Sequence, residues 1–177
     1  MNSSEDAVPV QVVFQGGGAK LCVLMAVCEV LKEFQSQGRI VINRVAGSSA
    51  GGIAAAMLSS NKPIPQFKVE IKILAEAHIR GLKVWRVWGL LRVLGGWPYF
   101  PKIDLQTFFH DLFCKNGGPL KVSDLQPTTQ IFFTDLYSMA SRLVPPDEPL
   151  PKALAKSCNF PFAFVGSKSG LTEVDGD

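Results

Sequence analysis

The chain has 177 residues, of which 47% are hydrophobic and 19% are charged, and its formal net charge is +3. This length and apolar fraction suit one domain with a buried core and exclude wholesale disorder. The small net charge gives no indication of a nucleic-acid partner. Because no run of about 18 uncharged apolar residues is present, we expect no membrane-spanning helix. The polar, acidic N-terminus, Met1 to Asp6, does not resemble a secretory signal.

The predicted elements alternate between strands and helices in the first half of the chain. Strands are predicted over 10–14, 40–46 and 129–136, helices over 19–34, 53–60, 66–80, 104–113 and 150–158, and further extended segments over 160–165 and 171–174. The first two strands each run through a glycine-rich turn directly into a helix, which favours a mostly parallel sheet with helices on both faces. We therefore expect an α/β fold, with a flexible N-terminal segment over 1–9 and one domain over 10–177.

The cysteines give no sign of a metal site or a disulfide. Cys22, Cys28, Cys114 and Cys158 contain no C-x-x-C pair and no ligand-spaced cluster. Cys22 and Cys28 fall nearly two turns apart on a predicted helix, which is too far for a disulfide. We expect four reduced, mostly buried thiols in a reducing compartment, and no structural zinc.

A basic, tryptophan-rich segment lies in the middle of the chain. Residues 78–102 contain five basic residues and no acidic residue, together with Trp85, Trp88 and Trp97. Tryptophan beside a basic side chain such as Arg86 is typical of a surface that rests on anionic lipid headgroups. A core helix with inward-facing rings and solvated basic groups fits this composition equally well, so both interpretations stay open.

The second glycine-rich turn is Gly47-Ser48-Ser49-Ala50-Gly51, a G-x-S-x-G pattern between a strand and a helix. A nucleophilic serine needs a sharp, strained turn, and glycines two positions before and after it remove side chains that would clash. The following helix directs its free N–H groups and positive dipole end at the same point. The frame predicts Ser49, and not Ser48, as a nucleophile. The alternative is a glycine-rich turn used only for close packing.

The first turn contains Gly16, Gly17, Gly18 and Lys20. Bare backbone N–H groups of glycines can hold the oxyanion of a tetrahedral intermediate, and Lys20 adds positive charge nearby. A dinucleotide-binding loop fits poorly, because Leu21 stands where the third glycine of G-x-G-x-x-G belongs. A Walker loop is excluded because the spacing around Lys20 is wrong.

A serine nucleophile needs a general base, and the chain has two histidines, His78 and His110. Both lie in the middle of the chain, whereas a Ser-His-Asp hydrolase with this kind of turn places its histidine last, after the acid. We therefore expect each histidine to be a surface or structural residue and a carboxylate to act as the base.

Taken together, these motifs resemble those of the patatin-like phospholipases, lipid acyl hydrolases with a Ser-Asp dyad. That family combines a G-G-G-x-[RK] loop, a G-x-S-x-G turn and a D-G-[GA] motif, and the similar residues here are 16–20, 47–51 and Asp175-Gly176-Asp177. The run 155–164, which includes Ser157, is similar to the segment that precedes the family's aspartate. The resemblance covers about Val10 to Asp177.

The resemblance implies a three-layer patatin-like fold and a two-step mechanism through an acyl-enzyme. It implies that Ser49 attacks the acyl ester and that Asp175 accepts the serine proton and returns it to the leaving alcohol. The implied oxyanion hole consists of backbone N–H groups at Gly16, Gly17 and Gly18. Supporting positions are Lys20, Gly47 and Gly51.

Three features depart from the family pattern. Lys20 and Leu21 stand where Arg and Gly are commoner, and Asp177 replaces the last residue of the dyad motif. Family members also continue beyond this motif. We therefore expect the domain to be truncated just after Asp175, with a second chain as one source of the missing part.

The sequence thus predicts a lipid acyl hydrolase, a phospholipase or esterase, that acts on phospholipid or another acyl lipid. It is expected to be cytoplasmic, to associate peripherally with membranes when active, and to need no cofactor or metal. Trp85, Arg86 and Trp88 are the predicted interfacial patch. An acyltransferase acting on lipid acceptors and a catalytically inactive lipid-binding module are the alternatives.

Overall fold

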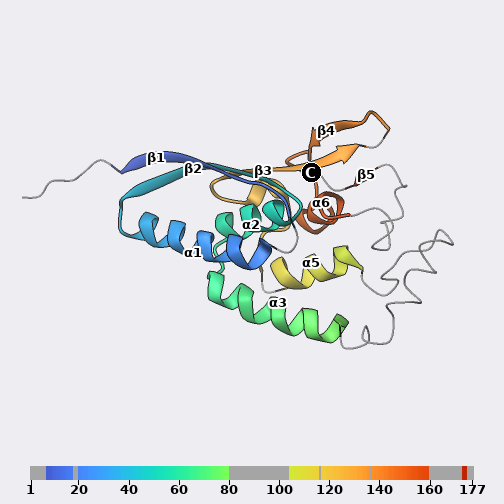
Figure 1. Ribbon diagram of the computed structural model, residues 1–177, viewed down its shortest axis with the longest axis horizontal. Coiled ribbons are helices and arrows are strands. Elements are labelled where there is room, and N and C mark those ends of the chain that lie inside the picture. The colour runs from blue at the N-terminus through green and yellow to red at the C-terminus, as the bar shows by residue number, and fades with distance from the viewer. Residues whose placement is uncertain are drawn as a thin grey trace, which may run out of the picture.

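The computed structural model describes residues 7–17, 20–79, 104–115, 117–135, 137–159 and 173–174, with the backbone alone for 75–79 and 173–174. Figure 1 shows their arrangement. In chain order the elements are β1 (Val8–Phe14), α1 (Leu21–Ser36), β2 (Ile40–Ser48), α2 (Ala50–Ser59), α3 (Ile64–Ile79), α5 (Leu105–Phe113), the 3-10 helix η3 (Val122–Asp124), β3 (Thr128–Asp135), β4 (Ala140–Leu143), α6 (Leu150–Ser157) and β5 (Glu173–Val174).

The strands form one mixed sheet in the order β1-β2-β3-β4. β1, β2 and β3 run parallel, with Phe14 beside Gly47 and Ser48 beside Phe132. β4 and β5 both pair antiparallel with β3. The predicted α/β fold, with parallel strands at its centre, is confirmed.

The strands and helices predicted within the described residues are present, with ends that move by a few residues. α2 begins at Ala50, directly after the turn, rather than at residue 53. β1 begins at Val8, so Val8 and Pro9, which the sequence assigns to a flexible N-terminal segment, pair with Ile40 and Val41 of β2. The predicted segment 160–165 lies outside the described residues.

The described helices lie on one side of the sheet (Figure 1). Strand side chains that point to this side, such as Val45 and Ile131, are fully buried in a core shared with α2 and α6. At alternate strand positions Val13 and Val41 remain 78% and 45% exposed. Within the described residues no helix covers this second face of the sheet. The helical layer predicted for this face is therefore not part of the described structure.

The central helix α2 is anchored at its C-terminal end. The ammonium group of Lys32 on α1 donates a hydrogen bond of 2.8 Å to the carbonyl of Ser60, the cap of α2. Burial lowers the pKa of Lys32, and its charge opposes the negative end of the helix dipole. The hydroxyl of Thr129 on β3 donates to that of Ser59 at 2.7 Å. These contacts hold this end of α2 against α1 and β3.

The N-terminal end of α2 packs directly on backbone. A Cβ atom added at Gly47 would lie 2.2 Å from the carbonyl oxygen of Gly51, and one added at Gly51 would lie 2.3 Å from the carbonyl oxygen of Phe14. Real Cβ atoms essentially never approach other atoms this closely. The ends of β1 and β2 therefore meet the first turn of α2 with no side chain between them, and both positions require glycine.

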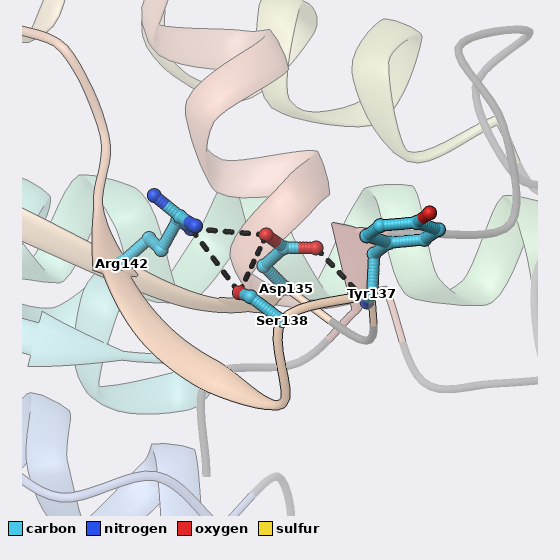
Figure 2. A network of polar contacts seen from close by, with 4 residues as sticks. All are labelled: Asp135, Tyr137, Ser138 and Arg142. Carbon is cyan, nitrogen blue, oxygen red and sulfur yellow. Dashed lines mark hydrogen bonds and ion pairs between the residues drawn. The ribbon is translucent and has the colours of Figure 1, made fainter.

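A carboxylate closes the hairpin between β3 and β4. Figure 2 shows Asp135 accepting hydrogen bonds from the backbone N–H of Tyr137 at 3.0 Å, the hydroxyl of Ser138 at 2.7 Å and Nε of Arg142 at 2.9 Å. These hydrogen bonds, that of the Ser138 hydroxyl most of all, lower the pKa of Asp135 below its ordinary value of 3.8. The sequence does not predict β4, because its residues Ala-Ser-Arg-Leu are all exposed and show no apolar alternation.

We expect the hairpin to loosen in acid through Asp135. Because the pKa of Asp135 is lower in the folded protein than in the unfolded chain, the unfolded chain takes up the proton first as the pH falls. The stabilisation is therefore complete above pH 3.8 and is lost as the pH falls through the folded pKa. Amide hydrogen exchange in β4, followed across this range, measures the effect. Asp135→Asn should remove this pH dependence, whereas Asp147→Asn, in the exposed loop before α6, should keep it.

We also expect Gly47→Ala to destabilise the fold by about 3 kcal/mol, because its Cβ overlaps the backbone of α2. Gly38→Ala is the matched control. Gly38 has φ 70° and nothing within 4 Å of an added Cβ. Gly38→Ala should therefore lower the free energy of unfolding only through backbone strain, by about 1 kcal/mol. Urea unfolding of the two variants gives both values, and equal losses would contradict the close approach of Gly47 and Gly51.

Candidate active site

Ser49 stands at the apex of the turn between β2 and α2. Its backbone has φ 50° and ψ −127°, and the residue is buried, with 7% of its surface exposed. A residue other than glycine adopts this conformation only where the surrounding structure enforces it, and such strain is concentrated at functional sites. The strand, sharp turn and helix predicted around Ser49 are therefore present, with the backbone geometry that a nucleophile turn requires.

The N-terminus of α2 begins at Ser49 itself. Ser49 is the N-cap of α2, and its carbonyl accepts the N–H of Ile53 at 3.1 Å. The N–H groups of the first helical turn, that of Ala50 first among them, have no partner within the helix and form the positive end of its dipole. Negative charge that develops beside Ser49 would therefore be stabilised. The sequence predicted this helix end without singling out Ala50.

The first glycine-rich loop lies against the same turn. A Cβ atom added at Gly51 would lie 2.8 Å from the carbonyl oxygen of Gln15, the residue before Gly16. Gly16 is buried, and Gly17 has φ 123°, a conformation that favours glycine. The structure thus brings Gln15, directly before this loop, against the turn that carries Ser49.

Lys20 closes this loop. Its N–H donates to the carbonyl of Gly17 at 2.7 Å, and the stem of its exposed side chain lies 3.3 Å from where a Cβ of Gly17 would be. Lys20 is also the N-cap of α1. Lys20 therefore lies beside Gly17, and its supporting role stays a prediction. Gly18 lies outside the described residues.

A buried hydroxyl on α6, for which the sequence predicts no role, contacts the turn of Ser49. Ser157 is fully buried, and its Oγ accepts the backbone N–H of Ser49 at 2.8 Å and donates to the carbonyl of Phe132 at 2.6 Å. The only sequence signal for it is its place in the run 155–164, and spacing along the chain could not pair it with Ser49.

The segment that precedes Asp175 reaches the same edge of the sheet. In β5, Glu173 pairs with Asp135 and Val174 with Thr134. β4 pairs with one edge of β3 over these residues, so β5 must pair with the other edge. That edge is the one with which β2 pairs, and β2 ends there at the pair of Ser48 and Phe132. β5 therefore runs along β3 toward the point where β2 ends. Asp175 itself lies outside the described residues.

Of the two histidines, the structure describes the side chain of His110 alone. The side chain of His110 on α5 is 60% exposed and lies 3.7 Å from the Asp111 carboxylate. The side chain of His78 is outside the described residues, as are Trp85, Arg86 and Trp88. The described part of the chain contains no group of three or more His, Cys, Asp or Glu residues that could hold a metal ion.

The four cysteines are free thiols. Cys28 and Cys114 are buried, whereas Cys158 is partly buried and Cys22 is exposed. Burial raises the pKa of Cys28 to about 12 and also raises that of Cys114, so both remain protonated and unreactive at neutral pH. Neither buried cysteine is therefore a candidate nucleophile.

A cavity of about 630 Å³ lies at the opposite end of α2, lined by residues that include Ser59, Lys62 and Phe113. Its basic group is already paired, since Lys62 forms a salt bridge with Glu70 and donates to the carbonyl of Leu112 at 2.7 Å. The cavity therefore offers no free charge of Lys62 to a ligand, and Ser49 is not part of its lining.

Across the described helices, none is both long and apolar enough to cross a membrane.

Two solved structures of a complex of ExoU with SpcU, from the type III secretion system of Pseudomonas aeruginosa, contain a chain similar to this one. In one, the identity is 20% and the TM-score 0.50 over 89% of this chain and 39% of the other. In the second, the identity is 21% and the TM-score 0.51 over 94% of this chain and 39% of the other. Likeness at this level of identity shows the fold, and this chain spans well under half of the matched chains. No curated protein matches it in sequence.

The family model described as patatin-like phospholipase matches residues 12–177. This match includes the turn of Ser49, the glycine-rich loop and the segment of β5. The chain belongs to the patatin-like phospholipase family.

Proposed function

We propose that this protein hydrolyses acyl esters of lipids, with Ser49 as the nucleophile. The observation that supports this most is the backbone of Ser49, which has φ 50° at the N-terminus of a helix, with the glycine-rich loop against it. A turn used only for close packing would not need a strained serine at its apex. The membership of the patatin-like phospholipase family supports the same chemistry.

The proposed general base is Asp175. His110 is exposed on α5, whereas β5 runs along β3 toward the end of β2 and is followed directly by Asp175. Asp175 would take the proton of the Ser49 hydroxyl as Oγ attacks the acyl carbon, and would give it to the leaving alcohol oxygen as that bond breaks. Water would then attack the acyl-enzyme, its proton passing to Asp175 and on to Ser49 as the acid leaves. A carboxylate shielded from water is the stronger base that this step needs.

The proposed oxyanion hole combines two sources of backbone N–H groups. One is the loop of Gly16, Gly17 and Gly18, and the other is the first turn of α2, where Ala50 follows the nucleophile. The N–H of Ser49 is not available for this purpose, because Ser157 accepts it. Each donor of this kind contributes about 10²–10³ in rate in a comparable hydrolase.

The proposed substrate is a phospholipid or another acyl lipid at a membrane surface, reached by a cytoplasmic protein that binds the membrane peripherally. The solved structures that resemble this chain hold ExoU together with SpcU. Val13 and Val41 are exposed on the sheet face that no described helix covers, and they favour a further covering part, supplied by another segment of the protein or by a second chain.

We expect a fluorophosphonate to label the folded, full-length protein at Ser49. Ser49→Ala should abolish both labelling and ester hydrolysis, and Asp175→Asn should slow both by about 10²–10⁴-fold through loss of the general base. Ser48→Ala is the matched control, since Ser48 is the neighbouring serine of the same turn but lies outside the nucleophile frame, and it should still be labelled. Mass spectrometry of the labelled peptide and ester turnover are the measurements.

A folded full-length protein that no fluorophosphonate labels would overturn the proposal. Lipid binding that survives Ser49→Ala, with no turnover in either protein, would identify an inactive lipid-binding module. Acylated glycerol or acylated lysolipid among the products, when either acceptor is added, would identify an acyltransferase.

We expect Trp85 and Trp88 to form the membrane contact. Replacing both with alanine should weaken binding to anionic vesicles more than hydrolysis of a soluble ester, because interfacial tryptophans stabilise the membrane-bound state. Vesicle co-sedimentation and soluble-ester turnover, measured on the same preparation, separate the two effects. Equal losses in both would indicate a folding role for this pair.

A further inference from the structure

We infer that Ser157 is a positioning residue for the nucleophile, which holds the backbone of Ser49 in its strained conformation through the hydrogen bond between Ser157 Oγ and Ser49 N–H. This inference rests on the proposed role of Ser49. It assigns to α6 a direct part in shaping the turn between β2 and α2.

The bridge that Ser157 forms has a fixed direction. Its hydroxyl hydrogen is donated to the carbonyl of Phe132 at 2.6 Å, so a lone pair of the same oxygen is left to accept the N–H of Ser49 at 2.8 Å. Ser157 is 0% exposed, and water therefore does not compete for either bond. The hydroxyl joins the last paired position of β2 and β3 to the apex of the turn.

This bond acts on the dihedral angle that is strained. The angle φ describes rotation about the N–Cα bond of Ser49, and the direction of the N–H fixes one side of that rotation. α2 fixes the other side, because the carbonyl of Ser49 accepts the N–H of Ile53 at 3.1 Å. A φ of 50° is therefore retained between two anchored groups, and the direction of the Ser49 side chain is set with it.

A second glycine in α2 supports this assignment independently. The contact with β1 explains why position 51 is glycine, but Gly52 does not face β1. Because glycine weakens a helix relative to alanine, its presence at position 52 needs another reason. A Cβ atom added at Gly52 would lie 3.3 Å from Ser157 Oγ, nearer than to any other atom. The bare backbone of Gly52 thus gives Ser157 the space in which it reaches Ser49.

α6 also contacts the strand that leads to the proposed base. The helix packs against both β3 and β5, and Lys156, next to Ser157, lies with its ammonium group 5.5 Å from the ring centre of Phe133 on β3. Ser157 therefore ties the turn of Ser49 to the same helix that packs against β5, the strand directly before the proposed base in the sequence.

The test is Ser157→Ala in the full-length protein, with fluorophosphonate labelling of Ser49 and steady-state ester hydrolysis as readouts. We expect kcat and the labelling rate to fall about tenfold with little change in KM, as for loss of one buried hydrogen bond. Ser157→Thr, which keeps the hydroxyl, should recover part of the rate.

Ser59→Ala is the matched control. Ser59 is also a buried hydroxyl between α2 and β3, since it accepts the Thr129 hydroxyl at 2.7 Å, but it lies at the other end of α2. Both alanine variants should lower the unfolding midpoint, whereas Ser157→Ala alone should lower kcat. Equal kcat in Ser157→Ala and wild type would overturn the inference, as would equal losses of kcat in the two variants.

Gly52→Ala keeps the Ser157 hydroxyl but perturbs its hydrogen bonds to Ser49 and Phe132. This variant is used as the test if Ser157→Ala does not fold. We expect a smaller fall in kcat than in Ser157→Ala, and an unchanged kcat in Gly52→Ala would then contradict the inference. Failure of the proposed function is seen separately, as a wild-type protein that is neither labelled nor active.

Discussion

The structure depends on one close approach of backbones, where the end of β2 meets the start of α2 at Gly47 and Gly51. Gly51 also admits the end of β1, since a Cβ atom added there would lie 2.3 Å from the carbonyl oxygen of Phe14. Three elements therefore converge without intervening side chains. Any side chain here would separate α2 from the sheet, and the turn between them could not remain sharp.

A sharp turn places its apex residue in a conformation that costs energy, so the neighbouring contacts must hold it. α2 is secured at its far end by Lys32 and Thr129, and Ser49 caps its near end. Ser157 supplies the contact on the sheet side. Ser49 is thus held both by direct contacts, from Ser157 and within α2, and by the contacts that secure the far end of α2.

Short-range patterns explain which parts of this arrangement the sequence could predict. The parallel strands and the helices follow from runs of apolar residues that end in glycine-rich turns, and the frame around Ser49 depends only on Gly47 and Gly51, two positions away. β4 could not be predicted, because its residues are exposed and it is held by the contacts of Asp135 with Ser138 and Arg142. The bond between Ser157 and Ser49 joins positions 108 residues apart, and only the fold brings such positions together.

The sheet topology supports the proposed pairing of Ser49 with a carboxylate far along the chain. β2 leaves the edge of β3 after Phe132, because it turns away into α2, and the next backbone groups of β3 on that edge need another strand. β5 fills this place at Thr134 and Asp135. The strand that satisfies the sheet therefore runs back toward the turn of Ser49, and the residue that follows it in the sequence is Asp175. The described helices that carry the histidines, α3 and α5, pack mainly against other helices, and this supports the proposed Ser-Asp dyad rather than a triad with histidine.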